Sequence, residues 1–258
     1  MKKNTKEDAI TLHSKQAGKF ASNYELQPTN ALSNCFNYSR RRLDILLEGC
    51  FPIEGRGFRL LDVGCGTGHH MMRFCQRGFD VSAIDGSEKM LSYARANNPG
   101  TEILQADVEK IPFPDDSFDF VLCVEVLRYL PSYSKCIQEM ARVLKPRGVC
   151  IATATPLFSL NGYWLVNRIA SLWHVGDLVR LRQNFSTSWG LRREFRHAGF
   201  DAPEIHGVYF GPINWVERLL PGILPWFLKA WEPLDASLAD LPVLREFTNM
   251  FLVKTVKK

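Results

Sequence analysis

Short apolar runs alternate with helix-like stretches through the middle of the chain. The apolar runs are nearly continuous, as in strands that are buried on both faces of a parallel sheet. We predict such strands at Phe58–Val63, Asp80–Ile84, Glu102–Ala106, Asp119–Val124 and Val149–Ala154. The helices predicted between them span Thr67–Arg77, Glu88–Asn97 and Ser132–Leu144. Strands alternating with helices in this way are typical of an α/β fold with crossover helices.

The two ends of the chain lack this alternation, although we expect one domain overall. Residues 1–50 predict one or two helices packed across a core of residues 51–156. Residues 157–258 depart from the alternation and contain two apolar stretches, at 157–185 and 211–245. The elements predicted in this last part are a long apolar helix over 157–182, a helix over Ser188–Ala198, and strands at 205–211 and 250–256.

Composition excludes several classes of protein. The 258 residues are 46% hydrophobic and 23% charged, which excludes a disordered or fibrous chain. The seven cysteines are odd in number and show no CxxC or Cys/His spacing, so we expect free thiols, no zinc site and a reducing cytoplasm. We expect neither a signal peptide nor a membrane-spanning segment, because no apolar run is long enough.

The net charge of +5 is unevenly distributed. Residues 60–156 carry a net charge of −2, and both flanks are basic. A protein that binds nucleic acid more often shows a dense basic stripe, so we do not expect nucleic acid as a partner. A second asymmetry is that all six tryptophans lie after residue 156.

The strongest chemical signal is the sequence LLDVGCGTG at 60–68, where an apolar strand enters a glycine-rich turn before a helix. Glycines permit a tight turn close to a ligand, and the start of the helix presents free N–H groups. Asp85 ends the next strand, 21 residues after Gly64, where an acidic side chain can accept hydrogen bonds from a ribose. The alternative is a plain turn with Asp85 as a helix cap. The order of strand, turn, helix, strand and acid favours a nucleoside site.

The glycine spacing narrows the choice of nucleoside. A dinucleotide site usually has GxGxxG, whereas the third glycine here is Gly68 and a histidine follows at position 69. No GxxxxGK[ST] loop is present either. NAD, FAD and nucleoside triphosphates are therefore disfavoured, although a nicotinamide-dependent oxidoreductase and a non-catalytic nucleoside-binding module remain as alternatives.

Four motifs within residues 58–156 carry a family resemblance: LLDVGCGTG, VSAIDGSEKML, ADVEKIPFPDDSFDFVLCVEVLRYL and EMARVLKPRGVCIA. In this order they resemble the class I S-adenosylmethionine-dependent methyltransferases, in particular the small-molecule group that contains the ubiquinone and menaquinone C-methyltransferases. The resemblance implies a Rossmann-like, mostly parallel seven-stranded sheet with an antiparallel last strand, helices on both faces, and S-adenosylmethionine as cofactor. It also implies that residues 1–50 form an N-terminal lid, and that residues 157–258 complete the sheet and carry insertions at 157–185 and 211–245 that cap the substrate site.

The resemblance also implies a cofactor site. Asp62 and the glycine turn would hold the methionine end, Asp85 the ribose, and Asp107 the adenine amino group. The Cys123 carbonyl would accept from the ammonium group, although Met90 and Cys123 could equally be core residues. The implied cofactor-binding residues are Asp62, Gly64, Cys65, Gly66, Thr67, Gly68, Asp85, Gly86, Met90, Asp107, Val108 and Cys123.

Methyl transfer from a sulfonium needs mainly positioning, so the sequence need not show a general base, and we assign none. Motifs for methylating nucleobase amines, for cytosine C5 chemistry and for a catechol-type magnesium site are absent. We therefore expect a small lipophilic or aromatic acceptor and no metal. The residues proposed to border the acceptor are Tyr24, Tyr129, Trp164 and His174.

The tryptophan-rich insertions admit three interpretations. They could line an apolar substrate pocket, which we favour, or merely fill the core of a larger cap. They could also contact a membrane surface through Trp164 and Trp173 with Arg168, Arg180 and Arg182 beside them. We therefore expect a cytoplasmic protein that is peripheral to the membrane only if this last interpretation holds.

Overall fold

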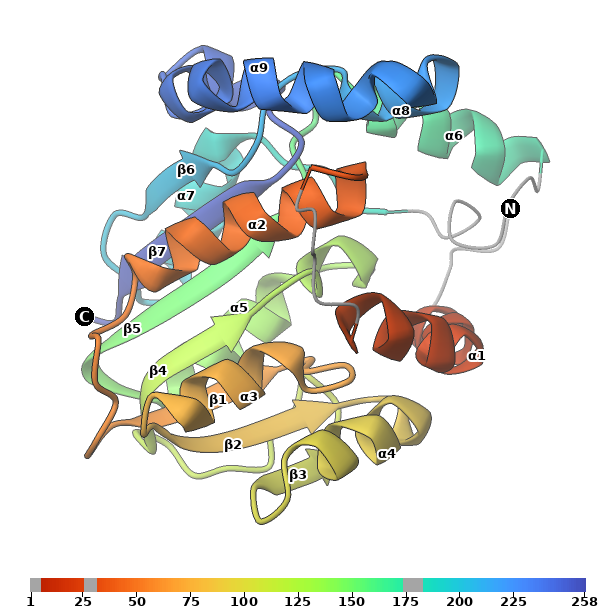
Figure 1. Ribbon diagram of the computed structural model, residues 1–258. Helices are drawn as coiled ribbons and strands as arrows, with labels where there is room; N and C mark the ends of the chain where they lie inside the picture. The colour runs from red at the N-terminus through yellow and green to blue at the C-terminus, as the bar shows by residue number, and fades with distance from the viewer. Residues whose placement is uncertain (1–5, 26–31, 174–182) are drawn as a thin grey trace.

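The computed structural model describes residues 6–25, 32–173 and 183–258, and its centre is one seven-stranded sheet (Figure 1). The strand order is β3-β2-β1-β4-β5-β7-β6. β7 runs antiparallel to both of its neighbours, and the other pairs are parallel. This confirms the predicted mostly parallel sheet with an antiparallel last strand. The strands are β1 (Arg59–Val63), β2 (Asp80–Asp85), β3 (Glu102–Gln105), β4 (Phe118–Cys123), β5 (Leu144–Ala154), β6 (Glu204–Gly207) and β7 (Phe251–Val256).

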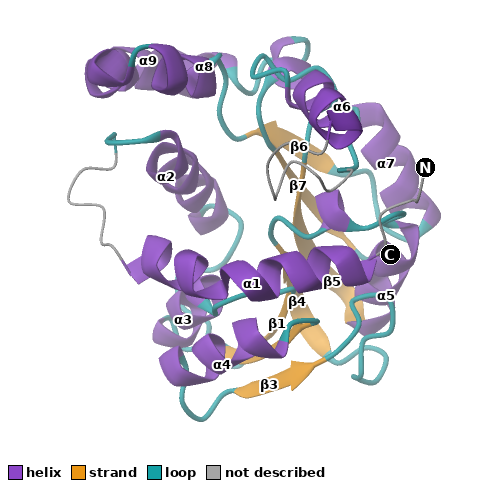
Figure 2. Cartoon of the chain, turned by 90° about the vertical axis from the view of Figure 1, so that its right-hand side faces the viewer, coloured by secondary structure: helices purple, strands orange, loops and turns teal. Residues whose placement is uncertain are grey.

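Helices cover both faces of the sheet. Buried side chains of α2, α3 and α4 form one core with one face, and those of α5 and α7 form the core on the other. α1 lies beyond the carboxyl ends of the central strands, which it crosses in Figure 2. The helices are α1 (Lys6–Glu25), α2 (Cys35–Glu48), α3 (His69–Gln76), α4 (Glu88–Asn97), α5 (Ser134–Val143), α6 (Tyr163–Trp173), α7 (Ser188–His197), α8 (Ile213–Leu219) and α9 (Leu224–Leu238), with short 3-10 turns η1 (Leu127–Tyr129), η2 (Pro221–Ile223) and η3 (Leu244–Phe247).

The structure corrects two boundaries in the second half of the chain. β5 starts at Leu144, five residues earlier than predicted, because this residue pairs with Phe118 before a register shift in the ladder. β6 ends at Gly207 instead of continuing to residue 211. A Cβ at Gly207 would lie 2.0 Å from the Ala239 carbonyl oxygen, so the cap closes directly over the end of this strand.

The insertion over 157–182 is not one long helix in the part that is described. Residues 157–162 form turns, and the helix α6 covers only Tyr163–Trp173. Residues 174–182 lie outside the described residues. The division into lid, core and cap stays a prediction. Among the described helices, none is both long and apolar enough to cross a lipid bilayer.

A buried carboxylate fastens the C-terminal cap to α2. Asp235 of α9 is fully buried, accepts from the Tyr38 hydroxyl and from the Phe210 N–H at 2.6 Å, and lies 3.5 Å from Arg42 Nε. Burial raises the pKa of Asp235 to about 6, although these partners oppose the rise. Because α2 also packs on the sheet, these bonds fix the position of the cap relative to the carboxyl ends of the strands.

Candidate cofactor and acceptor site

A cavity of about 260 Å³ opens where the carboxyl ends of β1, β2 and β4 meet the helix α1. In an open parallel sheet this edge is where ligands usually bind. Its walls combine the glycine-rich turn, carboxylates and aromatic side chains. The lining residues fall into a cofactor-type half and an aromatic half, which the following paragraphs describe in turn.

The glycine turn adopts backbone angles that only glycine takes without strain. Gly64, Gly66 and Gly68 have φ angles of +75°, +55° and +83°. A Cβ at Gly64 would lie 2.2 Å from the Val126 side chain, and one at Gly68 would lie 2.6 Å from Asn98. A Cβ at Gly66 would meet no atom within 4 Å. Packing therefore requires two of the glycines, whereas Gly66 leaves open space.

Asp85 holds this turn together from the end of β2. Its carboxylate accepts from the Gly66 N–H at 2.9 Å and from the Ser87 N–H at 2.8 Å. The cap of α4 is instead Ser87, whose hydroxyl accepts from Met90 N–H. Burial raises the pKa of Asp85, although the two N–H bonds oppose the rise. The residue expected to bind a ribose is therefore already oriented at the edge of the cavity.

Asp62 is a buried acid that lacks a cation. Its side chain is 2% exposed, and its Oδ2 has no hydrogen-bond partner within the described part of the chain. Burial raises its pKa to about 7, and the Asp85 charge adds to the rise. A buried, unpaired carboxylate is costly unless a positive group neutralises it. The cavity wall is thus suited to a ligand that carries an ammonium group.

The helix α1 closes the cofactor-type half like a lid. Lys6 at its start bonds Asp107 at 2.5 Å and Glu109 at 2.7 Å. Further along, the Ile10 side chain lies where a Cβ on Gly86 would be, at 2.7 Å. Gly86 therefore allows the lid to approach the end of β2 closely.

Aromatic side chains form the other half of the cavity. Tyr24 of α1 stacks on His69 with ring centroids 4.5 Å apart and meets the edge of Phe36. Tyr129 contacts the His13 ring edge-on at 4.5 Å. Burial lowers the pKa of His13, so this imidazole is neutral near pH 7. No motif in the sequence around His13 distinguishes it from the other histidines.

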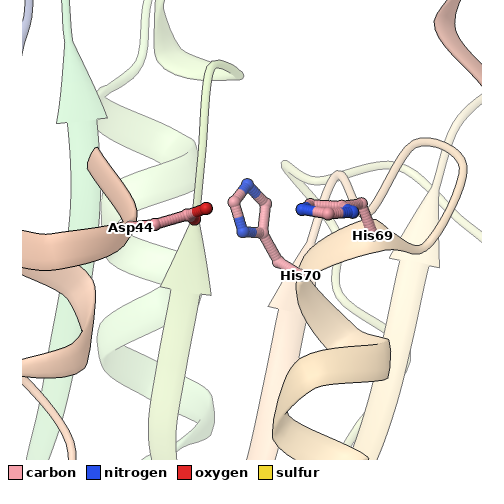
Figure 3. Close-up of side chains that lie close together, drawn as sticks. All are labelled: Asp44, His69 and His70. Carbon is pink, nitrogen blue, oxygen red and sulfur yellow. The ribbon is translucent and has the colours of Figure 1, made fainter. Parts of the chain in front are cut away.

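Two neighbouring histidines and Asp44 form a cluster beside these rings (Figure 3). Their potential ligand atoms lie within 4.8 Å of one another. Burial, with the nearby Arg40 and Arg73, lowers the pKa of His69 to about 4 and that of His70 to about 3. The Asp44 carboxylate is paired with Arg73, whereas His69 Nε2 and His70 Nδ1 are buried and have no hydrogen-bond partner among the described residues.

Glu125 is a second feature that the sequence motifs did not reveal. It follows β4 with a φ of +59°, which is uncommon for a residue other than glycine, and its N–H donates to Thr153 Oγ1 at 2.7 Å. Its carboxylate accepts from Arg128 at 2.5 Å, and Arg128 also donates to Gln183. Strained residues of this kind cluster at functional sites.

Most residues expected from the sequence line this cavity, although nothing tests the roles assigned to them. Ten of the twelve cofactor residues do so. Gly68 is absent from the lining because it packs against α4, and the Cys123 side chain is buried in the sheet core. Tyr24 and Tyr129 line the cavity, whereas Trp164 lies outside its lining on α6 and His174 lies outside the described residues.

Comparison with known proteins identifies a methyltransferase domain in the chain. The family model described as methyltransferase domain matches residues 61–152. Malonyl-acyl-carrier-protein O-methyltransferase of Erwinia pyrifoliae is 38% identical over 137 residues, which are 49% of this chain and 52% of that protein. Demethylmenaquinone methyltransferase of Staphylococcus aureus is 37% identical over 109 residues, 39% of this chain and 45% of that protein. The chain thus spans about half the length of these curated relatives.

Solved structures share the fold over nearly the whole chain. An S-adenosylmethionine-dependent methyltransferase from Thermotoga maritima superposes with a TM-score of 0.63 and 17% identity, covering 96% of this chain and 99% of that one. The [4+2]-cyclase SpnF superposes with a TM-score of 0.66 and 18% identity, covering 100% of this chain and 98% of that one. Residues 61–152 are thus a methyltransferase domain by family, and the chain shares the fold of the S-adenosylmethionine-dependent methyltransferase from Thermotoga maritima.

Proposed function

We propose that this protein transfers a methyl group from S-adenosylmethionine to a small lipophilic or aromatic acceptor. The observation that carries the proposal is the buried Asp62 carboxylate at the base of the glycine turn, whose Oδ2 has no hydrogen-bond partner and which no described cation neutralises. An isolated buried charge is rare unless a ligand completes it, and the ammonium group of the cofactor has the required charge. The open space at Gly66 supports the same assignment.

The residues present fit this cofactor. Asp62 would bind the ammonium group, Asp85 the ribose hydroxyls, and Asp107 the adenine amino group, with Met90 and Val108 against the ring. When bound, the cofactor supplies a methyl group that is already activated on a sulfonium. Because Lys6 bonds Asp107 in this structure, an adenine would share or displace that bond.

The chain itself would contribute positioning and exclusion of water. α1 covers the cavity, and Tyr24, Phe36 and Tyr129 present aromatic surface to an acceptor. Proximity and orientation of this kind can contribute about 7–11 kcal/mol to a displacement reaction. The neutral His13 can accept a proton or a hydrogen bond from an acidic acceptor group, which a protonated imidazole could not do.

The aromatic walls favour a planar acceptor. The names of the two curated relatives specify a malonyl carrier protein and demethylmenaquinone as their substrates. The apolar lining supports an acceptor of the second kind more than a charged acyl group. A lipid-soluble acceptor is held in membranes, so we further propose that the protein works at a membrane surface.

The test is label transfer. The purified protein is incubated with S-adenosylmethionine bearing a trideuteriomethyl group and with a detergent-solubilised lipid extract, and products are found by mass spectrometry. We expect a labelled apolar product and an equal amount of S-adenosylhomocysteine. The Asp85→Asn variant provides the matched control, in which the label should be lost. Binding of S-adenosylhomocysteine without turnover of any extract fraction would favour a non-catalytic module, and the match in fold to a cyclase makes this control necessary.

A further inference from the structure

The end of α8, the turn η2 and the start of α9 expose a run of apolar side chains. Leu219 is 69% exposed and Trp226 is 70% exposed, with Leu220 and Ile223 about half exposed between them. We call these four residues the α8–α9 patch. Monomeric proteins seldom expose apolar side chains contiguously without a partner.

The α8–α9 patch is not needed for the core. α9 already buries Leu224 and Leu228 on its inner side, and Trp231 on that side donates to the Phe210 carbonyl at 2.8 Å. Trp226 lies between these anchors in sequence but points outward. α8 and α9 form the outermost layer of the fold, at the top of Figure 1. The apolar side chains therefore face away from the protein.

The charges around the patch are basic. Arg218 and Lys229 flank it, both exposed, and neither forms an ion pair with any described residue. The acids of the same two helices face elsewhere, since Glu217 accepts from the Cys35 N–H at 3.0 Å and Glu232 pairs with Arg41 at 2.9 Å. Apolar side chains flanked by unpaired basic side chains are complementary to a bilayer, because the apolar groups can enter the acyl layer while the basic groups contact anionic headgroups.

We infer that the α8–α9 patch docks the protein onto a lipid bilayer that contains anionic headgroups. Leu219, Leu220, Ile223 and Trp226 enter the interface, and Arg218 and Lys229 lie at the headgroups. The inference rests on the proposed work at a membrane surface and names the segment and lipid charge. It differs from the expectation that the basic side chains of 157–182 make this contact.

The position of α2 links the patch to the cavity. Cys35 and Arg41 bond α8 and α9, whereas Phe36, one residue after Cys35, lines the cavity. The same helix thus contacts the docking helices and the acceptor end of the site. An acceptor leaving the bilayer beside α8 and α9 would have a short route to the aromatic walls.

Vesicle binding tests the inference. The full chain is sedimented with vesicles of phosphatidylcholine alone or mixed with phosphatidylglycerol. We expect binding to the mixed vesicles that weakens with salt. Replacing Leu219 and Trp226 together by serine should lower the partition coefficient at least tenfold, because two large apolar groups no longer enter the interface. Arg218→Glu combined with Lys229→Glu should abolish the preference for phosphatidylglycerol.

The control is Trp189→Ser on α7, where a tryptophan is 72% exposed but the other large apolar side chains of the helix, Leu191 and Phe195, are buried. This variant should bind like the wild type, and melting temperatures should be unchanged in all variants. Undiminished binding by the serine variant would overturn the patch as the docking surface. Absence of vesicle binding, with a concentration-dependent dimer that the serine variant loses, would assign the patch to a second copy instead. The label-transfer assay in detergent remains independent of both outcomes.

Discussion

Replacing Asp62 by asparagine should raise the free energy of unfolding of the ligand-free protein and, at the same time, weaken cofactor binding. The side chain keeps its size, and its oxygen can still accept the bond from the Met71 backbone. Only the buried charge is lost. The same replacement at a carboxylate that is ion-paired within the protein would instead lower the free energy of unfolding.

The magnitude follows from the pKa. Burial raises the pKa of Asp62 to about 7 in the folded protein, against about 3.9 in the unfolded chain. The folded form therefore binds more protons between these values, and this group makes the protein less stable as pH rises through them. At pH 8 the difference corresponds to about 4 kcal/mol, from which rearrangement around asparagine subtracts a part. We expect the variant to be stabilised by about 2–4 kcal/mol, or roughly 5–10 °C in melting temperature.

The same substitution should lower the affinity for the cofactor. A hydrogen bond to a charged group contributes about 1.5–3 kcal/mol, so Asp62→Asn should weaken S-adenosylhomocysteine about 10- to 150-fold. Melting curves at pH 5 and pH 8 and calorimetric titrations measure both effects, and the stabilisation should be much smaller at pH 5, where Asp62 is protonated. Asp80→Asn, an exposed change on the same sheet, should alter neither property. Lower stability at pH 8 with unchanged affinity would refute the reasoning.

Four further substitutions separate the parts of the site. Asp85→Asn should weaken S-adenosylhomocysteine at least tenfold by calorimetry, and an unchanged dissociation constant would contradict its role. Gly66→Ala should lower the free energy of unfolding in denaturant by about 1–2 kcal/mol, because of its positive φ, and should abolish ligand binding. Gly64→Ala should lower the free energy of unfolding further, because its Cβ meets Val126. A Gly64→Ala variant more stable than Gly66→Ala would be inconsistent with the loop geometry. Tyr129→Phe should leave S-adenosylhomocysteine affinity within about twofold and raise the acceptor KM several-fold, and a change confined to cofactor affinity would place this ring at the wrong end of the cavity.

The sheet and the glycine turn could be predicted because their signals are local. Each central strand is a short apolar run, and LLDVGCGTG contains both the strand and the turn. Asp85 was found for the same reason, since its position follows directly from the end of β2. The start of β5 was missed because Leu144 continues the helical pattern of α5, and only pairing with Phe118 makes it a strand residue.

The aromatic half of the cavity could be predicted only in part: Tyr24 and Tyr129 are expected there from the sequence, but the rest is assembled from distant segments. Asp44 comes from α2, whereas His69 and His70 follow the glycine turn, so no spacing in the sequence brings them together. The fit of Ile10 over Gly86 and the role of Gly68 in packing against Asn98 also exist only in the folded chain. Sequence patterns thus predict most of the residues that line the glycine-turn side of the cavity, whereas the contacts between distant segments appear only in the folded chain.

The most direct test of the central claim is a calorimetric titration of the wild-type protein with S-adenosylhomocysteine and, separately, with NADH. We predict one S-adenosylhomocysteine bound per chain and no detectable heat from NADH. A saturable signal from NADH with none from S-adenosylhomocysteine would contradict the assignment of the glycine-turn cavity to S-adenosylmethionine.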